Sequence, residues 1–103
     1  MSNISPLNVI TNLKSVAIWM HNVIKAYESG AIPKKTASAL SKRTLKKFSK
    51  YIPNPEEREN YDKLLDLFSS LSTVDRADGN FEKFYLGSLK EELDTLLESL
   101  EVA

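Results

Sequence analysis

Apolar residues recur at alternating steps of three and four along four segments of the chain, and glycine or proline separates neighbouring segments. Such steps follow the repeat of an α-helix, so each segment predicts a helix with an apolar face. No run of residues alternates between apolar and polar for long enough to suggest a strand. The pattern therefore predicts an all-α fold, an antiparallel bundle of about four helices in a single domain that spans residues 1–103.

The predicted helices cover about residues 6–29, 37–52, 55–72 and 81–101. We expect the first to begin at Ser5, with Pro6 in the first helical position, and to end before Gly30 in a left-handed cap. Asn54 is placed to cap the third helix, with Glu57 three residues later as in a capping box.

Each predicted helix has an apolar stripe that we expect to face the core. The stripe of the second helix is narrow and ends on Ile52, and Phe84 joins the stripe of the fourth helix. The main members in chain order are Ile10, Leu13, Ala17, Met20, Ile24 and Tyr27; Leu40, Thr44, Phe48 and Ile52; Tyr61, Leu64, Leu65, Phe68 and Leu71; and Leu86, Leu89, Leu93, Leu96 and Leu100.

The side chains that most enzymes need are scarce. The chain has no cysteine and one histidine, His21, and the position three residues before it is Ile18 rather than the glutamate of a di-iron motif. The three glycines are scattered and form no phosphate-binding loop. We therefore expect no catalytic residue, no metal site, no cofactor and no small-molecule substrate, and we expect His21 to be a residue at the edge of the core.

The chain has no segment that predicts insertion in a membrane. The longest strongly apolar run, Val16 to Met20, is far shorter than the roughly 20 residues that cross a bilayer. Residues 1–6 lack the basic and apolar parts of a signal peptide. Together with the absence of cysteine, these features favour a cytoplasmic location and no membrane partner.

Charge is divided between the two halves of the chain. Residues 1–52 contain nine basic residues and one acidic residue, Glu28, whereas residues 53–103 contain five basic and thirteen acidic residues, so the halves carry net charges of +8 and −8. Part of this division follows from helix dipoles, which favour cations at C-termini and anions at N-termini. Lys46, Lys47 and Lys50 end the second helix, Glu56, Glu57 and Glu59 begin the third, and the two groups can also form ion pairs.

Other charges break the dipole rule and are candidates for binding a partner. Lys34 and Lys35 precede the second helix, whereas Glu98 and Glu101 lie near the end of the fourth. The glutamates predict a surface for a basic partner, unless they are only solvated. The basic residues predict a surface for nucleic acid or an acidic partner, unless they only pair with the third helix; they are Lys34, Lys35, Lys42, Arg43, Lys46, Lys47 and Lys50.

The first helix carries a second apolar stripe, formed by Val9, Val16, Trp19, Val23 and Ala26. A helix with two apolar sides is either sandwiched between neighbours or presents one side to another chain. In the second case Val16, Trp19 and Val23 would bind a partner protein or a second copy, with Trp19 as the anchor.

These features favour a non-catalytic helical protein-interaction module, an accessory subunit or small regulator of a larger complex. Its expected partner is another protein, with a homodimer as one form. The alternative is a small protein that binds nucleic acid without sequence preference through the basic side of the second helix.

Overall fold

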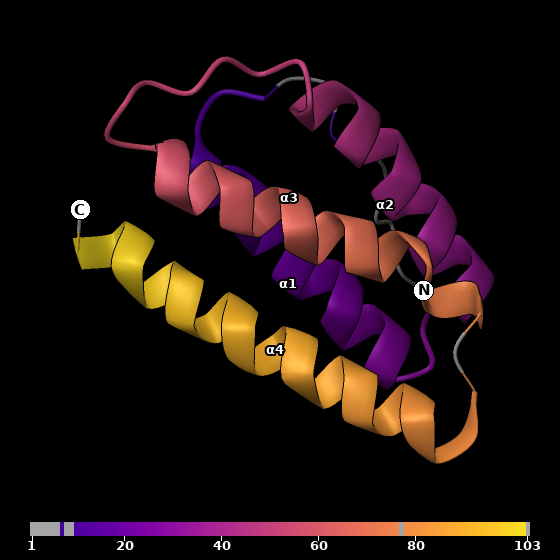
Figure 1. Cartoon of the computed structure of the whole chain (residues 1–103). Helices are drawn as coiled ribbons and strands as arrows, with labels where there is room; N and C mark the ends of the chain where they lie inside the picture. The colour runs from indigo at the N-terminus through magenta and orange to yellow at the C-terminus, as the bar shows by residue number, and fades with distance from the viewer. Residues whose placement is uncertain (1–6, 8–9, 77, 103) are drawn as a thin grey trace.

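A computed structural model describes residues 7, 10–76 and 78–102, except for the side chains of residues 81 and 102. This part of the chain forms helices α1 (Leu13–Glu28), α2 (Lys34–Phe48), α3 (Arg58–Ser72) and α4 (Gly79–Val102), with a short 3-10 helix, η1 (Val74–Arg76), before α4. Consecutive α-helices run in opposite directions (Figure 1), so the predicted all-α antiparallel bundle is confirmed.

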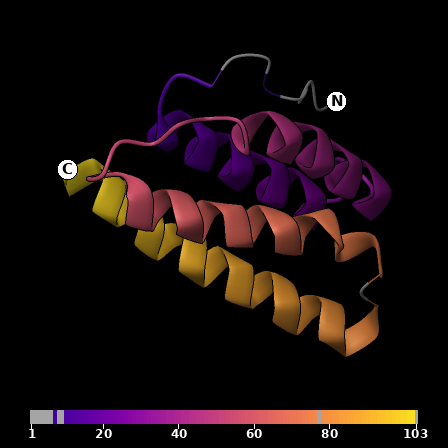
Figure 2. The same cartoon turned by 45° about the horizontal axis from the view of Figure 1, so that its top comes forward.

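The four helices are arranged with α1 and α3 in the middle and α2 and α4 on opposite edges (Figures 1 and 2). α2 packs mainly against α3, and α4 packs mainly against α1. Because α1 also contacts α2 and α3, it has neighbours on several sides. The arrangement places α2 and α4, the two most strongly charged helices, on opposite edges of the bundle.

α1 begins later than the sequence pattern predicted. The backbone of Asn12 is extended, and its side-chain oxygen accepts the N–H of Ser15 at 2.8 Å. This is the geometry of an N-cap, in which the side chain satisfies a free backbone N–H of the first turn, so α1 begins directly after Asn12. Ser5 and Pro6, where we expected the start, lie outside the described residues. At the other end Gly30 has the expected left-handed backbone, with a φ of +82°.

α2 lies about three residues nearer the N-terminus than predicted. Pro33 is its N-cap residue, and the Pro33 carbonyl accepts the N–H groups of Thr36 and Ala37. The helix ends at Phe48, with Ser49 as its C-cap residue, and Pro53 disfavours helical geometry at Ile52, so the helix does not extend to the predicted end. The prediction that Ile52 belongs to the apolar stripe is wrong, since its side chain is 89% exposed.

The capping box expected before α3 is present. Asn54 Oδ1 accepts the Glu57 N–H at 2.9 Å, and Glu57 Oε1 accepts the Asn54 N–H at 3.2 Å. Regular helix then begins at Arg58. The α2–α3 loop, residues 49–57, is therefore fastened where it enters α3.

An aromatic cluster joins α1, α2 and α3. Phe48 lies at its centre, with ring centroids 4.8 Å from Tyr61 and 5.6 Å from Phe68. Trp19 stacks on Phe68 at 5.9 Å, and Tyr51 stacks on Tyr61 at 6.0 Å. The Tyr61 hydroxyl donates a hydrogen bond to the Phe48 carbonyl at 2.9 Å, which satisfies a carbonyl at the end of α2.

A buried polar link holds the other end of α2. The Ser38 hydroxyl donates to the Ser72 carbonyl at the end of α3 and lies 3.2 Å from an Asp75 carboxylate oxygen of η1. Ser38 and Ser72 are both buried. Buried polar groups are costly unless they are paired, so this link specifies how α2 sits against α3 and η1.

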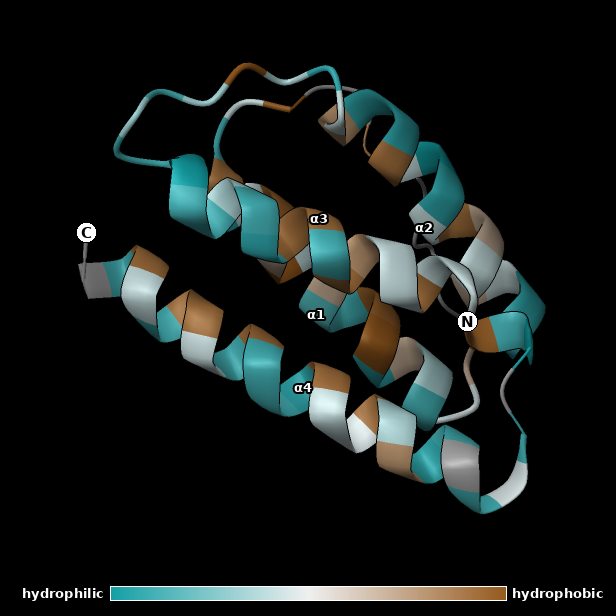
Figure 3. Ribbon diagram, in the orientation of Figure 1, coloured by the Kyte–Doolittle hydropathy of each residue, from teal (hydrophilic) through white to brown (hydrophobic). Residues whose placement is uncertain are grey.

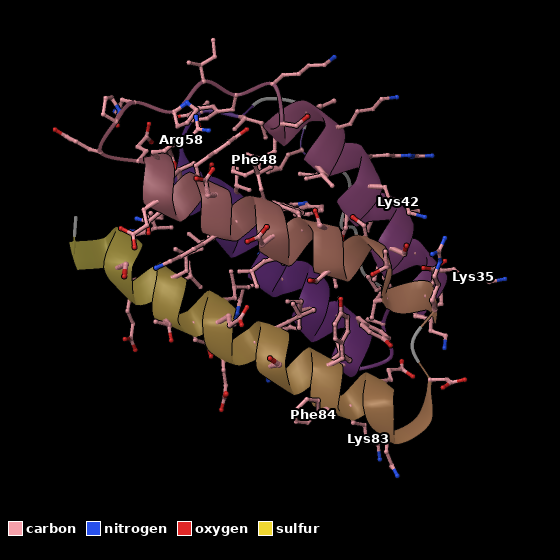
Figure 4. All side chains as sticks on the ribbon, viewed as in Figure 1. Lys35, Lys42, Phe48, Arg58, Lys83 and Phe84 are labelled. Carbon is pink, nitrogen blue, oxygen red and sulfur yellow. The ribbon has the colours of Figure 1, made fainter. Side chains whose placement is uncertain are left out.

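The predicted apolar stripes of α3 and α4 mostly face the interior, where apolar residues gather in Figure 3. Phe84 is an exception because its side chain is 77% exposed on the outer side of α4 (Figure 4). None of the helices in the described part of the chain combines the length and the apolar composition that a bilayer crossing needs.

Candidate functional site

The predicted partner-binding side chains of α1 lie inside the fold. Val16 and Val23 are fully buried, and Trp19 is 8% exposed. α2, α3 and α4 all contact α1 and cover both of its apolar stripes. The prediction that Val16, Trp19 and Val23 bind a partner is therefore wrong, and the alternative of a sandwiched helix describes α1. Val9, the first member of that stripe, lies outside the described residues.

His21 lies at the boundary between α1 and α4. Its Nδ1 atom is 3.8 Å from Oδ1 of Asp94, and its side chain is partly exposed. Within the described ranges, no three His, Asp or Glu side chains converge as ligands for a metal ion.

The outer side of α2 is a continuous basic surface. We call it the basic face and define it by six exposed residues: Lys35, Lys42, Arg43, Lys46, Lys47 and Lys50. The chain has no acidic residue between positions 34 and 50, so nothing on α2 itself neutralises this surface. Lys35 and Lys42 point away from the bundle in Figure 4.

Lys34 is not part of the basic face. Its Nζ atom lies 3.9 Å from a carboxylate oxygen of Glu82 in α4, and both side chains are partly buried. The pair compensates a cation placed at the unfavourable end of α2. The prediction that Lys34 binds an acidic partner is therefore replaced by an intramolecular ion pair.

Most of the basic face is not neutralised by the fold. Across residues 7, 10–76 and 78–102, no carboxylate lies within ion-pair distance of five of its six members, namely Lys35, Lys42, Arg43, Lys46 and Lys50. Glu57, which we expected to pair with the end of α2, instead accepts hydrogen bonds from the Tyr51 hydroxyl and the Asn54 N–H. For Lys46 and Lys50, pairing with the start of α3 does not account for their placement.

A groove with an acidic rim lies between α3 and α4, which the sequence pattern did not reveal. Its volume is about 550 Å³. Buried Leu67 and Leu96 form the floor. We call it the acidic groove, and its remaining lining residues are Lys63, Asp66, Glu91, Glu92, Thr95 and Ser99. The carboxylates of Asp66, Glu91 and Glu92 have no cation within ion-pair distance among the described residues.

The end of α4 extends this negative surface. Glu98 and Glu101 are exposed, and in the described part of the chain neither forms an ion pair. Both remain candidates for contact with a basic partner. Since α2 and α4 occupy opposite edges of the bundle (Figures 1 and 2), the basic face and the acidic groove are separated in space as well as in sequence.

The structure therefore offers charged surfaces as its candidate sites. Comparisons with protein-family models, with curated proteins and with solved structures each found no match to this chain. The exposed charges of α2, α3 and α4 are accordingly the features of this chain that bear on its function.

Proposed function

We propose that this chain is a non-catalytic interaction module, an accessory subunit or small regulator of a larger complex, that binds an acidic partner protein through the basic face of α2. The first helix contributes to this role as part of the core rather than as a contact surface. Electrostatic attraction supplies recognition, and the rigid bundle supplies the geometry.

The observation that carries the proposal is the unneutralised basic face. Five exposed cations have no carboxylate at ion-pair distance among the described residues, although the same fold pairs Lys34, Lys63 and Lys90. Lys42, Arg43 and Lys46 lie within little more than one helical turn, so a single partner surface can contact all three. No ion pair within the described part of the chain engages these charges, and their exposure leaves them free for contact with another molecule.

The proposal is tested by affinity capture from an extract of the source organism. We would compare the wild type with a variant that neutralises the centre of the basic face, Lys42→Gln, Arg43→Gln and Lys46→Gln. The expected result is a protein partner that the wild type retains after nuclease treatment and that this variant loses.

A matched control removes the same charge elsewhere. Lys14, Lys25 and Lys83 are exposed residues of α1 and α4, and their substitution by Gln should leave capture unchanged. Equal capture by all three proteins would refute a role for the basic face.

The second candidate function is sequence-independent binding of nucleic acid through the same face. It is favoured by the alignment of Lys35, Lys42 and Lys46, which follow one line along α2 at intervals of seven and four residues. That line is about 16 Å long, a length over which one strand of B-DNA carries about five phosphates.

Electrophoretic mobility shifts with short duplex and single-stranded DNA or RNA test this second function. Binding should weaken steeply with salt. The triple substitution at Lys42, Arg43 and Lys46 should lower the slope of log affinity against log salt by about 2 to 3. The absence of any shift at low salt would exclude nucleic acid and leave the protein partner.

A further inference from the structure

Ile52 is an apolar side chain displayed at the basic end of α2. It is 89% exposed, and Lys50 precedes it by two residues. The backbone on both sides is held in place. Tyr51 packs on Phe48 and Tyr61 on one side, and the capping box fastens the other side. A side chain presented on a fastened loop loses little conformational freedom when it docks.

The acidic groove has the complementary properties. Its floor consists of leucine side chains, and its lining holds one cation, Lys63, which pairs with Glu59. In the described part of the chain, the carboxylates of Asp66, Glu91 and Glu92 have no cation within ion-pair distance. Its volume of about 550 Å³ is in the range of pockets that enclose small ligands. It therefore has room for an isoleucine side chain with lysine side chains beside it.

We infer that the acidic groove of one copy of this chain receives Ile52, Lys46 and Lys50 of a second copy. Ile52 contacts Leu67 and Leu96 at the floor, and the two lysines pair with the carboxylates at the rim. The charges of the two surfaces select this occupant, because the basic end of α2 meets an acidic rim in this contact, whereas α2 against α2 or groove against groove would bring like charges together.

The contact joins two different surfaces of the chain. Two copies that exchange it reciprocally form a closed dimer, whereas an unreciprocated contact is heterologous and builds a ring or a head-to-tail array. In an open array, one groove stays free at one end and one Ile52 stays free at the other end. The inference goes beyond the proposed function and does not depend on it, since it requires no other molecule.

Light scattering and sedimentation of the full chain over a range of concentrations test the inference. At low salt the average mass should rise with concentration above the 11.6 kDa of one chain. It should fall back toward one chain at about 1 M salt, where screening reduces charge interactions to within about 3 Å. Ile52→Ser should weaken association about tenfold or more, while circular dichroism shows an unchanged fold because the side chain is exposed.

Charge reversal identifies the two surfaces. Lys46→Glu with Lys50→Glu should abolish association, and so should Glu91→Lys with Glu92→Lys. An equimolar mixture of these two variants should associate again. The unchanged acidic groove of the first variant can receive the unchanged lysines of the second, and the reversed groove of the second can receive the reversed residues of the first. The matched control, Lys14→Glu with Lys25→Glu, should associate as the wild type does.

A wild type that stays monomeric at low salt, or a mixture of reversed variants that fails to associate, would overturn the inference. A monomeric chain that still captures an acidic partner through Lys42, Arg43 and Lys46 would leave the proposed function intact. The two ideas can therefore fail separately.

Discussion

Replacing Trp19 by alanine should cause a large loss of stability without changing the mass of the particle. The side chain is 8% exposed and its ring stacks on Phe68 with centroids 5.9 Å apart. Truncation of a buried tryptophan or phenylalanine to alanine costs about 3–5 kcal/mol. The unfolding free energy of a chain of 103 residues is about 5–15 kcal/mol, so the variant should be close to the limit of folding.

Urea unfolding measures this loss of unfolding free energy. Far-ultraviolet circular dichroism is the signal to follow, because Trp19 is the only tryptophan and its substitution removes the tryptophan fluorescence. With an m-value of about 1.5 kcal/mol/M, the midpoint should fall by about 2–3 M. Ile18→Ala is the matched control. Ile18 is the neighbouring residue and is 43% exposed, so its truncation should cost less than about 1 kcal/mol. The reasoning is refuted if Trp19→Ala loses no more than Ile18→Ala and instead dissociates a dimer into folded monomers.

Two further predictions concern polar groups of the core. Ser38→Ala should lower the unfolding free energy by about 1–3 kcal/mol, because the Ser72 carbonyl loses its donor; exposed Ser69→Ala is the control in the same urea titration, and equal values for both would contradict the prediction. Burial raises the pKa of the Tyr61 hydroxyl above its ordinary value of 10.0. The folded state therefore binds more protons than the unfolded state above pH 10, and the unfolding free energy should fall as the pH rises further. Tyr61→Phe should weaken this fall in alkaline denaturation curves, and an identical slope for both proteins would disprove it.

The helices were predictable from sequence because their apolar repeats and caps are local signals. The Asn54–Glu57 capping box and the left-handed Gly30 are set by residues within four positions of each other. The start of α1 was not predictable to the same degree, since Ser5 followed by Pro6 and Asn12 are both acceptable N-cap signals. The choice between them depends on contacts that periodicity does not encode.

The candidate site was less predictable because it depends on which helices become neighbours. Periodicity identified Val16, Trp19 and Val23 as a second apolar stripe, but whether a stripe faces the core or solvent depends on how many helices surround it. Lys34 was noticed for breaking the dipole rule, yet its partner Glu82 lies 48 positions away in the sequence. The acidic groove requires α3 and α4 side by side, and neither helix reveals it alone.

The conformation of the segment from Lys46 to Ile52 was not predicted correctly, because the predicted helix continued to Ile52. We expected Ile52 to continue the apolar stripe, because four-residue steps connect it with Phe48 and Thr44. The helix stops at Phe48, and that stop turns a predicted core residue into the most exposed of the large apolar side chains that the structure describes. A proline one residue further on was the local signal for this outcome.

The opposite placement of α2 and α4 has a consequence for how the molecule moves near a charged partner. The chain has a formal net charge of zero, so a distant field exerts little net pull on it. The separated charges nevertheless form an electric dipole, and a field acts on a dipole as a torque. A charged surface would therefore rotate this protein into a preferred orientation before short-range contacts form, and the two edges of the bundle would determine which side arrives first.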